Sequence, residues 1–217
     1  MMQFDRILLG KQAKELGFVR DTFEKVCRLA DVLTFMESDP LLAESLALKG
    51  GTAINLTILN LPRLSVDIDL DFSKDVSREP MLVERKQIFL HIKKYMEATG
   101  YSLSFKSKRY HALDSFVYEY INAGGMKDNL KIEINYMLRC HVLPVSRRTA
   151  CLPWTSQTLT VLSVIRWHSG SVEGATLHIR KYRKYKDYMA RAVLRSSFFQ
   201  FIHAVFSGDL RGGSCFF

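Results

Sequence analysis

The feature that most constrains this chain is a run of eight residues, 65–72, in which an acidic side chain recurs at every second position. Asp67, Asp69 and Asp71 alternate there with apolar residues. A period of two is the side-chain period of a β-strand, so the run predicts a strand with an apolar face and an acidic face. The face expected to meet a core carries Val66, Ile68, Leu70 and Phe72, and the opposite face carries Ser65 and the three aspartates.

Three carboxylates on one strand face are unusual, because aspartate is depleted in strands and like charges on one face repel each other. A bound cation would offset this repulsion, and Mg²⁺ together with the phosphates of a nucleotide is the chemistry that it indicates. The alternative is a solvated strand face that binds nothing, since an Asp-x-Asp motif also arises by chance. Asp71 lies one step further along the strand and also fits a solvated edge.

A glycine-rich element, Gly50-Gly51-Thr52, precedes the acidic run. Two glycines permit a tight turn and a close approach of the backbone to its neighbours. The helix predicted at residues 52–59 would place its N-terminus there, and the free N–H groups of a helix N-terminus bind anions. The turn and the carboxylates together predict phosphoryl or nucleotidyl transfer.

The periodicity of the remaining chain predicts a mixture of helices and strands. Further helices are expected at residues 21–37, 41–45 and 80–98, and further strands at residues 46–48, 102–107, 115–121 and 130–138. Asp21 is expected to cap the first helix, and Arg85 to lie on the exposed face of the helix at residues 80–98. This order of elements favours an α+β fold, a small mixed sheet with helices packed on it.

Residues 46–56 followed by residues 61–72 resemble the first motif of the AbiEii/AbiGii toxin nucleotidyltransferases, a family of the DNA polymerase β-like superfamily. That motif is Gly-Gly or Gly-Ser, a spacer the length of a helix, and Asp-x-Asp. Residues 131–136 resemble the second motif of the family, a strand of the type Lys-x-Asp/Glu. The resemblance covers residues 20–145 and implies a polymerase β-like nucleotidyltransferase core in residues 1–150, a small mixed sheet flanked by helices.

The resemblance also implies roles for individual residues. Asp67 and Asp69 would hold Mg²⁺, and Glu133 would support them from a neighbouring strand. The triphosphate would be cradled by Gly50, Gly51 and Thr52, with further contacts from Arg63, Ser65 and Lys131. Two alternatives stay open: Glu133 could simply pair with Lys131, and Ser65 could be an ordinary surface serine.

Residues 151–217 match the family poorly and are expected to form a helical C-terminal segment that is degenerate, truncated or frameshifted. Of the net charge of +9, this segment supplies two thirds, with nine Lys and Arg against three Asp and Glu. Such an excess suits an RNA partner, and a solvated basic surface explains it equally well. The four cysteines show no metal-ligand spacing, and neither a signal peptide nor a membrane span is apparent, so a cytoplasmic protein is expected.

The function implied by the resemblance is a metal-dependent nucleotidyltransferase, the toxin of a type IV toxin–antitoxin or abortive-infection system for phage defence. It would transfer a nucleoside monophosphate from an NTP to an RNA acceptor, which the family indicates is tRNA. A cognate antitoxin or transcriptional regulator would be its protein partner. The alternative is a catalytically inactive relic that binds nucleotide, RNA or an antitoxin without turnover.

Overall fold

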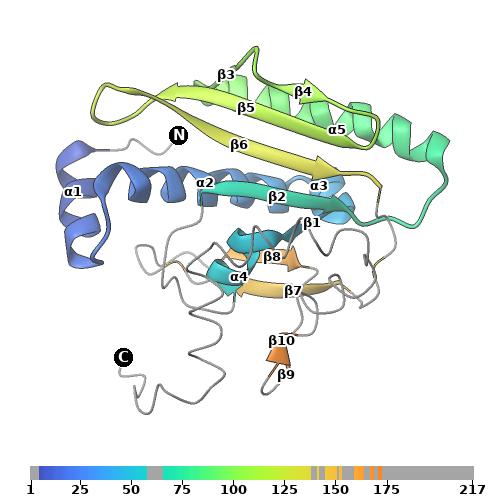
Figure 1. Cartoon of the computed structure of the whole chain (residues 1–217), viewed down its shortest axis with the longest axis horizontal. Coiled ribbons are helices and arrows are strands. Elements are labelled where there is room, and N and C mark those ends of the chain that lie inside the picture. Colours follow the sequence, from blue (N-terminus) through green and yellow to red (C-terminus); the bar gives the residue numbers. More distant parts are fainter. Residues whose placement is uncertain are drawn as a thin grey trace, which may run out of the picture. The chain divides into compact units, whose positions relative to one another are not determined.

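The computed structural model describes residues 5–57, 66–137, 141, 145–150, 152, 159–163, 167–168 and 171–172. Contacts along the backbone divide the chain into two units, Met1–Ile165 and Arg166–Phe217. The described part of the first unit has five helices and one sheet of eight strands (Figure 1). The described part of the second unit consists of β9 (Trp167–His168) and β10 (Ser171–Val172), which pair antiparallel.

The sheet of the first unit has the strand order β3-β5-β6-β2-β1-β8-β7, and β4 pairs with β5 alongside β3. Two pairs, β2–β6 and β1–β8, are parallel, and the other pairs are antiparallel, so the sheet is mixed. The strands are β1 (Leu46–Lys49), β2 (Asp67–Phe72), β3 (Ser102–Leu103), β4 (Lys108–Arg109), β5 (Leu113–Ile121), β6 (Lys127–Asn135), β7 (Ser146–Ala150) and β8 (Leu159–Ser163).

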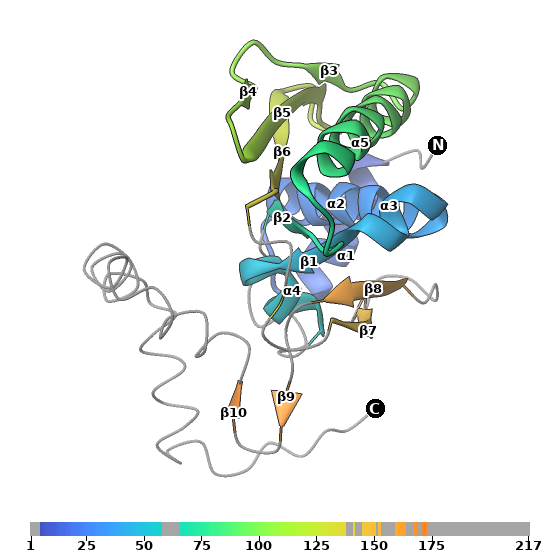
Figure 2. The same cartoon turned by 90° about the vertical axis from the view of Figure 1, so that its right-hand side faces the viewer.

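The helices are α1 (Arg6–Glu15), α2 (Arg20–Ser38), α3 (Pro40–Ser45), α4 (Gly50–Thr57) and α5 (Arg78–Ala98). Figures 1 and 2 show α2, α3 and α5 together on one face of β5, β6 and β2. The core lies between these helices and the apolar face of the strands, where Ile68, Phe72, Ile132 and Ile134 are fully buried. Burial of one face is what the alternation in β2 and β6 requires, and the opposite face of both strands is left for polar side chains.

The predicted helices are confirmed, with differences at their ends. Helix α2 begins after Val19, which makes no side-chain cap, and Asp21 lies inside the first turn, where it accepts hydrogen bonds from Arg20. The predicted cap at Asp21 is therefore wrong. Asp39 ends α2 and caps α3, because its Oδ1 accepts the N–H groups of Leu41 and Leu42.

Arg85 is buried, contrary to the expectation that it would be exposed on α5. Its Nη2 and Nε atoms lie 2.6 and 3.1 Å from the two carboxylate oxygens of Asp114 on β5, and Nη1 donates to the carbonyl of His111 at 2.8 Å. The guanidinium also lies over the ring of Tyr136, 4.7 Å from its centroid. A buried arginine is tolerated when its donors are matched in this way, which residue type alone does not reveal.

Of the predicted strand at residues 102–107, only Ser102–Leu103 is a strand, residues 104–107 form a turn, and β4 lies beyond the predicted range. Strand β8 extends the sheet beyond residue 150. Residues 159–163 alternate between buried and half-buried side chains, the pattern of a strand, and Leu48 of β1 aligns with Ser163. Of the described residues in the segment that was expected to be helical, 159–163, 167–168 and 171–172 are strands, and Leu152 has no regular secondary structure. The other expectations for that segment fall on residues outside the described ones.

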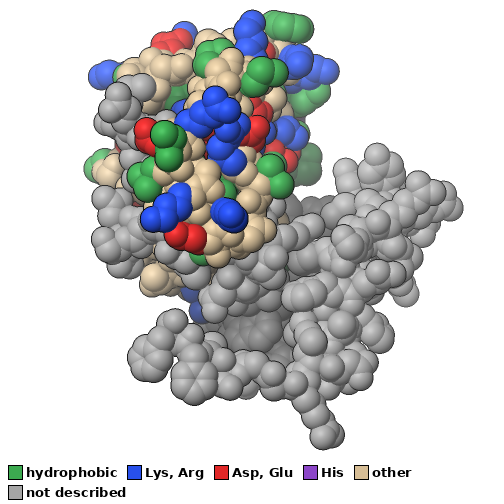
Figure 3. Space-filling model, turned by 90° about the vertical axis from the view of Figure 1, so that its left-hand side faces the viewer, with side chains coloured by type: hydrophobic (Ala, Val, Ile, Leu, Met, Phe, Trp, Pro, Cys, Tyr) green, Lys and Arg blue, Asp and Glu red, His purple; other side chains and the backbone are tan. Residues whose placement is uncertain are grey.

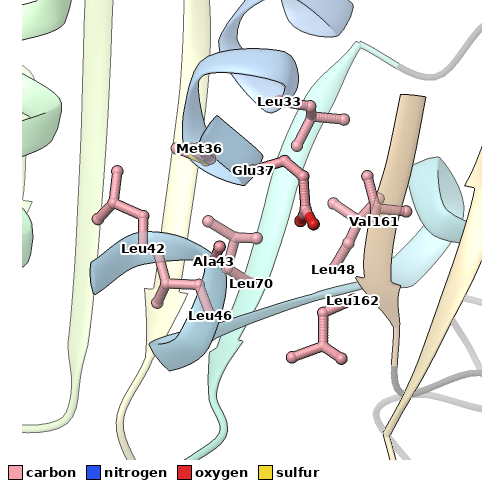
Figure 4. Close-up of a pocket in the computed structure, with 10 residues that line it drawn as sticks. All are labelled: Leu33, Met36, Glu37, Leu42, Ala43, Leu46, Leu48, Leu70, Val161 and Leu162. Atoms are coloured by element: carbon pink, nitrogen blue, oxygen red, sulfur yellow. The ribbon is translucent and has the colours of Figure 1, made fainter. Parts of the chain in front are cut away.

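A small cavity of about 20 Å³ lies among α2, α3, β1, β2 and β8 (Figure 4). It is lined by leucines of these elements, and the carboxylate of Glu37 points into it from α2. This carboxylate pairs with Arg147 of β7. The cavity has room for about one water molecule and none for a nucleotide. No helix among the described residues is long and apolar enough to cross a membrane.

Candidate active site

The polar face of the sheet gathers the predicted site residues on three neighbouring strands. In the parallel pair β2–β6, Asp67 lies opposite Lys131 and Asp69 opposite Glu133. On the other side of β2, Lys49 of β1 lies opposite Asp69. Residues that face one another on adjacent strands share one side of a sheet. The register therefore places Asp67, Asp69, Glu133 and Lys131 together on the face that α2 and α5 leave uncovered.

The two aspartates at the start of β2 have different surroundings. Asp67 is exposed, whereas Asp69 is half-buried. Burial raises the pKa of Asp69 above its ordinary value, and the carboxylates of Glu133 and Asp67 raise it further, although Lys49 and Lys131 act in the opposite direction. The negative charge around Asp69 is thus incompletely balanced by the protein, which is the condition that a bound cation relieves.

Glu133 and Lys131 form an ion pair, with 3.0 Å between Lys131 Nζ and Glu133 Oε1. Burial opposes the charge of Lys131, but its hydrogen bond to Glu133 and the nearby carboxylates of Asp67 and Asp69 outweigh it and raise its pKa. Both side chains remain partly exposed. The pairing that was left open from the sequence is therefore present, and Glu133 would have to give up this contact to join a metal site.

Asp71 lies on the same strand face as Asp67 and Asp69. The alternative that it lies at a solvated edge is wrong, because the side chain is buried and only 1% exposed. Its Oδ1 accepts from Lys49 Nζ at 2.5 Å and from Asn135 Nδ2 at 2.9 Å, while Oδ2 has no hydrogen-bond partner among the described residues. Lys49, which flanks the glycine turn, is consequently engaged with a carboxylate. Asp71, Lys49 and Asn135 tie β2 to both of its neighbours, so Asp71 has a structural role.

Gly50 lies in direct contact with Asp69. Its backbone has a φ of 70°, a conformation that residues with a side chain rarely adopt. A Cβ atom built on Gly50 would lie 2.6 Å from Asp69 Oδ2, which is closer than such atoms can approach. The glycine is needed both for the turn from β1 into α4 and for the space that the carboxylate occupies.

Thr52 fastens the start of α4 to the acidic strand, because its hydroxyl donates to the carbonyl oxygen of Asp67 at 2.5 Å. Thr52 is buried. Its hydroxyl positions the backbone of Asp67, and the contact with phosphate expected of Thr52 from the sequence stays a prediction. Gly51 belongs to the first turn of α4, where its carbonyl accepts from Asn55 Nδ2 at 2.8 Å.

Two of the predicted nucleotide contacts, Arg63 and Ser65, lie outside the described residues. Two residues that the sequence reading did not assign belong to the site's framework. Asn135 holds Asp71, and Asn55 is buried in α4 with its Oδ1 lacking a hydrogen-bond partner among the described residues. The alternation placed Asn135 on the polar face of its strand, but the partner that it holds depends on the pairing of β6 with β2.

A metal site is not closed in this arrangement. Within the part of the chain that the structure describes, no three His, Cys, Asp or Glu side chains form a group that could hold a metal ion. The donor set nevertheless suits a divalent cation, because Asp67, Asp69 and Glu133 supply only oxygen ligands, and burial together with the charges of Glu133 and Asp67 raises the pKa of Asp69.

The protein family described as nucleotidyl transferase AbiEii toxin, type IV TA system, matches residues 34–167. Among solved structures, the chain is similar to MenT4, a nucleotidyltransferase toxin from Mycobacterium tuberculosis H37Rv, with 19% identity, a TM-score of 0.50, and coverage of 74% of this chain and 55% of that one. It is also similar to JHP933 from Helicobacter pylori, with 20% identity, a TM-score of 0.38, and coverage of 55% and 46%.

The chain thus spans about half the length of the solved structures that it matches. No curated protein shows a significant sequence match to it. At 19% identity, the likeness to the mycobacterial protein shows the fold alone. The family match confirms the resemblance seen in the sequence motifs, and the mixed sheet flanked by helices confirms the predicted α+β fold.

Proposed function

We propose that this chain, which belongs to the nucleotidyl transferase AbiEii toxin family of type IV toxin–antitoxin systems, transfers a nucleoside monophosphate from an NTP to an RNA acceptor. The observation that carries the proposal is the placement of Asp67 and Asp69 on one strand, beside Glu133 and against the Gly50 turn that opens α4. A type IV toxin implies an antitoxin as its partner, and we include that partner in the proposal.

In this proposal Asp67 and Asp69 hold Mg²⁺, and Glu133 supports them after releasing Lys131. When bound, the metal lowers the pKa of the attacking hydroxyl and neutralises the pyrophosphate that leaves. The raised pKa of Asp69 supports this role: burial is its largest cause, and a cation between these carboxylates would offset the repulsion by Glu133 and Asp67 that adds to it.

The triphosphate would lie at the N-terminus of α4. The backbone N–H groups at the start of a helix have no partner within the helix and attract anions. Gly50 and Gly51 keep that terminus free of side chains, and Thr52 fixes it to the strand through Asp67. Lys131, a partly exposed cation beside the carboxylates of the site, would contact a phosphate oxygen as a point charge. Arg63 and Ser65 are proposed to assist from the segment that precedes β2.

The proposed acceptor is RNA. The chain has a net charge of +9, which favours a polyanionic substrate over a neutral one. A tRNA acceptor is the finer form of the proposal and rests on the resemblance of the motifs to the toxin family.

The test is transfer of label from each of the four α-³²P-labelled NTPs to purified RNA, with and without Mg²⁺, by the wild-type chain and by Asp67→Ala. The variant should lose transfer by about 10²–10³-fold, because several kcal/mol of transition-state stabilisation would be removed. It should also lose Mg²⁺-dependent NTP binding without a drop in melting temperature, because Asp67 is exposed and its removal lessens repulsion.

Asp75→Ala is the matched control, since Asp75 is an exposed aspartate beyond the end of β2. It should behave as wild type. If Asp67→Ala keeps wild-type transfer, the assignment of the acidic strand is wrong.

One observation favours the second candidate, an inactive relic that binds nucleotide, RNA or an antitoxin. Glu133 is paired with Lys131, and no three acidic side chains among the described residues converge on one point. Under this alternative the wild-type chain binds Mg²⁺ and NTP but transfers no label to any RNA tested.

A further inference from the structure

The outer edge of the sheet contains a turn that projects from it. Leu103 of β3 lies opposite Tyr118, and Lys108 of β4 lies opposite Ser115, so four residues, 104–107, stand against only two of β5. The two extra residues are Phe105 and Lys106 at the tip of the turn. Such an insertion in an edge strand pushes side chains out of the plane of the sheet.

Hydrogen bonds on both sides hold this turn in place. The N–H of Ser107 donates to the carbonyl of Ser104 at 3.0 Å, and the N–H of Ser104 donates to the carbonyl of Val117 at 2.8 Å. The hydroxyl of Ser107 accepts from the N–H of Val117 at 2.9 Å, and the hydroxyl of Ser104 donates to Glu119 at 2.6 Å. The turn is therefore anchored, and Phe105 stays 92% exposed on a fixed support.

The side chains of this edge are basic and aromatic. Lys106 and Lys108 are exposed and have no ion-pair partner among the described residues, and Tyr110 is 53% exposed. The nearby acids are engaged, because Glu119 accepts from Ser104 and Asp114 is bound by Arg85 and Arg109. Exposed rings alternating with free lysines are the means by which proteins bind single-stranded nucleic acid, through stacking on bases and attraction of phosphates.

The strand register connects this edge with the acidic site. Lys108 lies opposite Ser115, Ser115 opposite Glu133, and Glu133 opposite Asp69, so these side chains form one row across four strands. Val117, which anchors the turn, lies in the next row with Lys131 and Asp67. Figure 1 shows the corresponding order of β4, β5, β6 and β2. Three strand spacings of about 4.8 Å place Lys108 about 14 Å from Asp69 on the same face.

We propose that the 105–110 edge binds the single-stranded part of the acceptor RNA, so that its reacting end reaches Asp67 and Asp69 along these rows. Phe105 and Tyr110 stack on bases, and Lys106 and Lys108 contact phosphates. A span of about 14 Å corresponds to about four stacked nucleotides at 3.4 Å each, within the site sizes of small single-strand binders. The inference rests on the proposed transfer reaction only for the position of the RNA end.

Protection of an exposed sheet edge against association is the other explanation for this sequence. Lysines and a bulge serve that purpose, but an exposed phenylalanine works against it. Phe105 is thus the residue that distinguishes the two explanations, and it is the first to test.

The test measures binding of a fluorescein-labelled single-stranded RNA of about 12 nucleotides to the full chain by anisotropy, over a series of salt concentrations. Phe105→Ala should weaken binding about tenfold with an unchanged salt dependence, because alanine cannot stack on a base. Phe105→Tyr should bind like the wild type, because tyrosine keeps an aromatic ring that can stack. Lys106→Ala with Lys108→Ala should lower the slope of log Kd against log salt by about 1.4, or 0.7 for each lost phosphate contact.

Lys11→Ala with Lys14→Ala is the matched control for charge. Both lysines are exposed on α1, at the end of the molecule seen in Figure 3, where Lys and Arg side chains are interspersed with acidic and hydrophobic ones. Ile7→Ala, which removes an 83% exposed side chain of the same helix, is the control for apolar surface. Neither control should change the affinity or the slope by a comparable amount.

Equal effects of the α1 controls and the edge variants would overturn the proposal, and so would wild-type binding by Phe105→Ala. A loss of duplex RNA binding as large as the loss of single-strand binding would also count against it, because paired bases offer no free face to Phe105. If the edge variants behave as expected while the wild-type chain transfers no label, the transfer reaction is refuted and the RNA-binding edge stands.

Discussion

Replacing Gly50 by alanine tests whether the turn before α4 is built around the carboxylate of Asp69. The substitution adds one methyl group at a position where φ is 70° and where Asp69 Oδ2 would lie 2.6 Å from the new carbon. We expect Gly50→Ala to fold with a modest loss of stability and to lose most of the proposed transfer activity.

The stability loss follows from the backbone conformation. An alanine in the left-handed region costs about 1–2 kcal/mol relative to glycine. For a chain of this length, each kcal/mol lowers the melting temperature by about 2–4 °C, so a fall of about 2–8 °C is expected. Differential scanning fluorimetry measures this difference readily.

The activity loss follows from the contact with Asp69. An approach of 2.6 Å must open to at least 3.4 Å for ordinary van der Waals contact, so the carboxylate or the turn has to shift by most of an ångström. A displacement of about 1 Å in a catalytic group can lower a rate by about 10²-fold. Transfer should therefore fall by about that factor, with a parallel loss of Mg²⁺-dependent NTP binding.

Gly17→Ala and Gly125→Ala are matched controls, because their φ values of 75° and 80° impose the same backbone cost and no atom lies within 4 Å of the added carbon. Both should lose a similar amount of stability and keep full activity. Activity in Gly50→Ala equal to that of the two controls would refute the reasoning, since the contact with Asp69 would then have no consequence for the reaction.

Two further predictions concern buried groups. Asp71→Asn should lower the free energy of unfolding by about 1–3 kcal/mol in urea titrations, because Lys49 loses the negative charge of its partner. The loss stays moderate because Lys49, which is 28% exposed, can still reach water. An unchanged urea midpoint would show that this ion pair does not stabilise the fold. Burial, followed by the charges of Asp31 and Glu24, raises the pKa of Cys27 to about 12, so the native thiol should resist iodoacetamide at pH 8.5 and react in urea. Because the folded pKa is the higher one, the contribution of Cys27 to stability should be complete below pH 9.0 and decline above it. The labelling experiment uses a variant with serine at Cys140, Cys151 and Cys215, so that only Cys27 can react. Rapid labelling of this variant in its native state would contradict the burial of the Cys27 thiol.

The elements with the clearest periodicity were predicted well from the sequence. Alternation over residues 65–72 and 130–138 predicted the strands observed as β2 and β6, and also their buried faces, because side-chain period is a local property. Helices α2 and α5 were identified for the same reason. Apart from the neighbouring strand that the family resemblance implied for Glu133, which strand pairs with which could not be predicted, since pairing depends on the whole fold.

Three details of the site depended on that pairing. The alignment of Glu133 with Asp69 follows from the parallel register of β2 and β6, which no local pattern specifies. The burial of Asp71 follows from Lys49 and Asn135 on the two adjacent strands. The 104–107 turn follows from the mismatch in length between the edge strand and β5. In each case the residues were visible in the sequence, and their exact alignment across the strands was not.

The three aspartates of β2 show how one strand accommodates so much negative charge. At its inner end, Asp71 is paired with the charge of Lys49 and accepts a hydrogen bond from Asn135, and at its outer end, Asp67 is exposed to water. Asp69 lies between them, where burial first, and then the carboxylates of Glu133 and Asp67, raise its pKa against the opposing charges of Lys49 and Lys131. The fold thus satisfies two of the three charges by itself and leaves the middle one to be compensated from outside. Since Gly50 keeps the space against Asp69 open, the uncompensated charge and the accessible turn coincide at the point where a metal-bound nucleotide is proposed to lie.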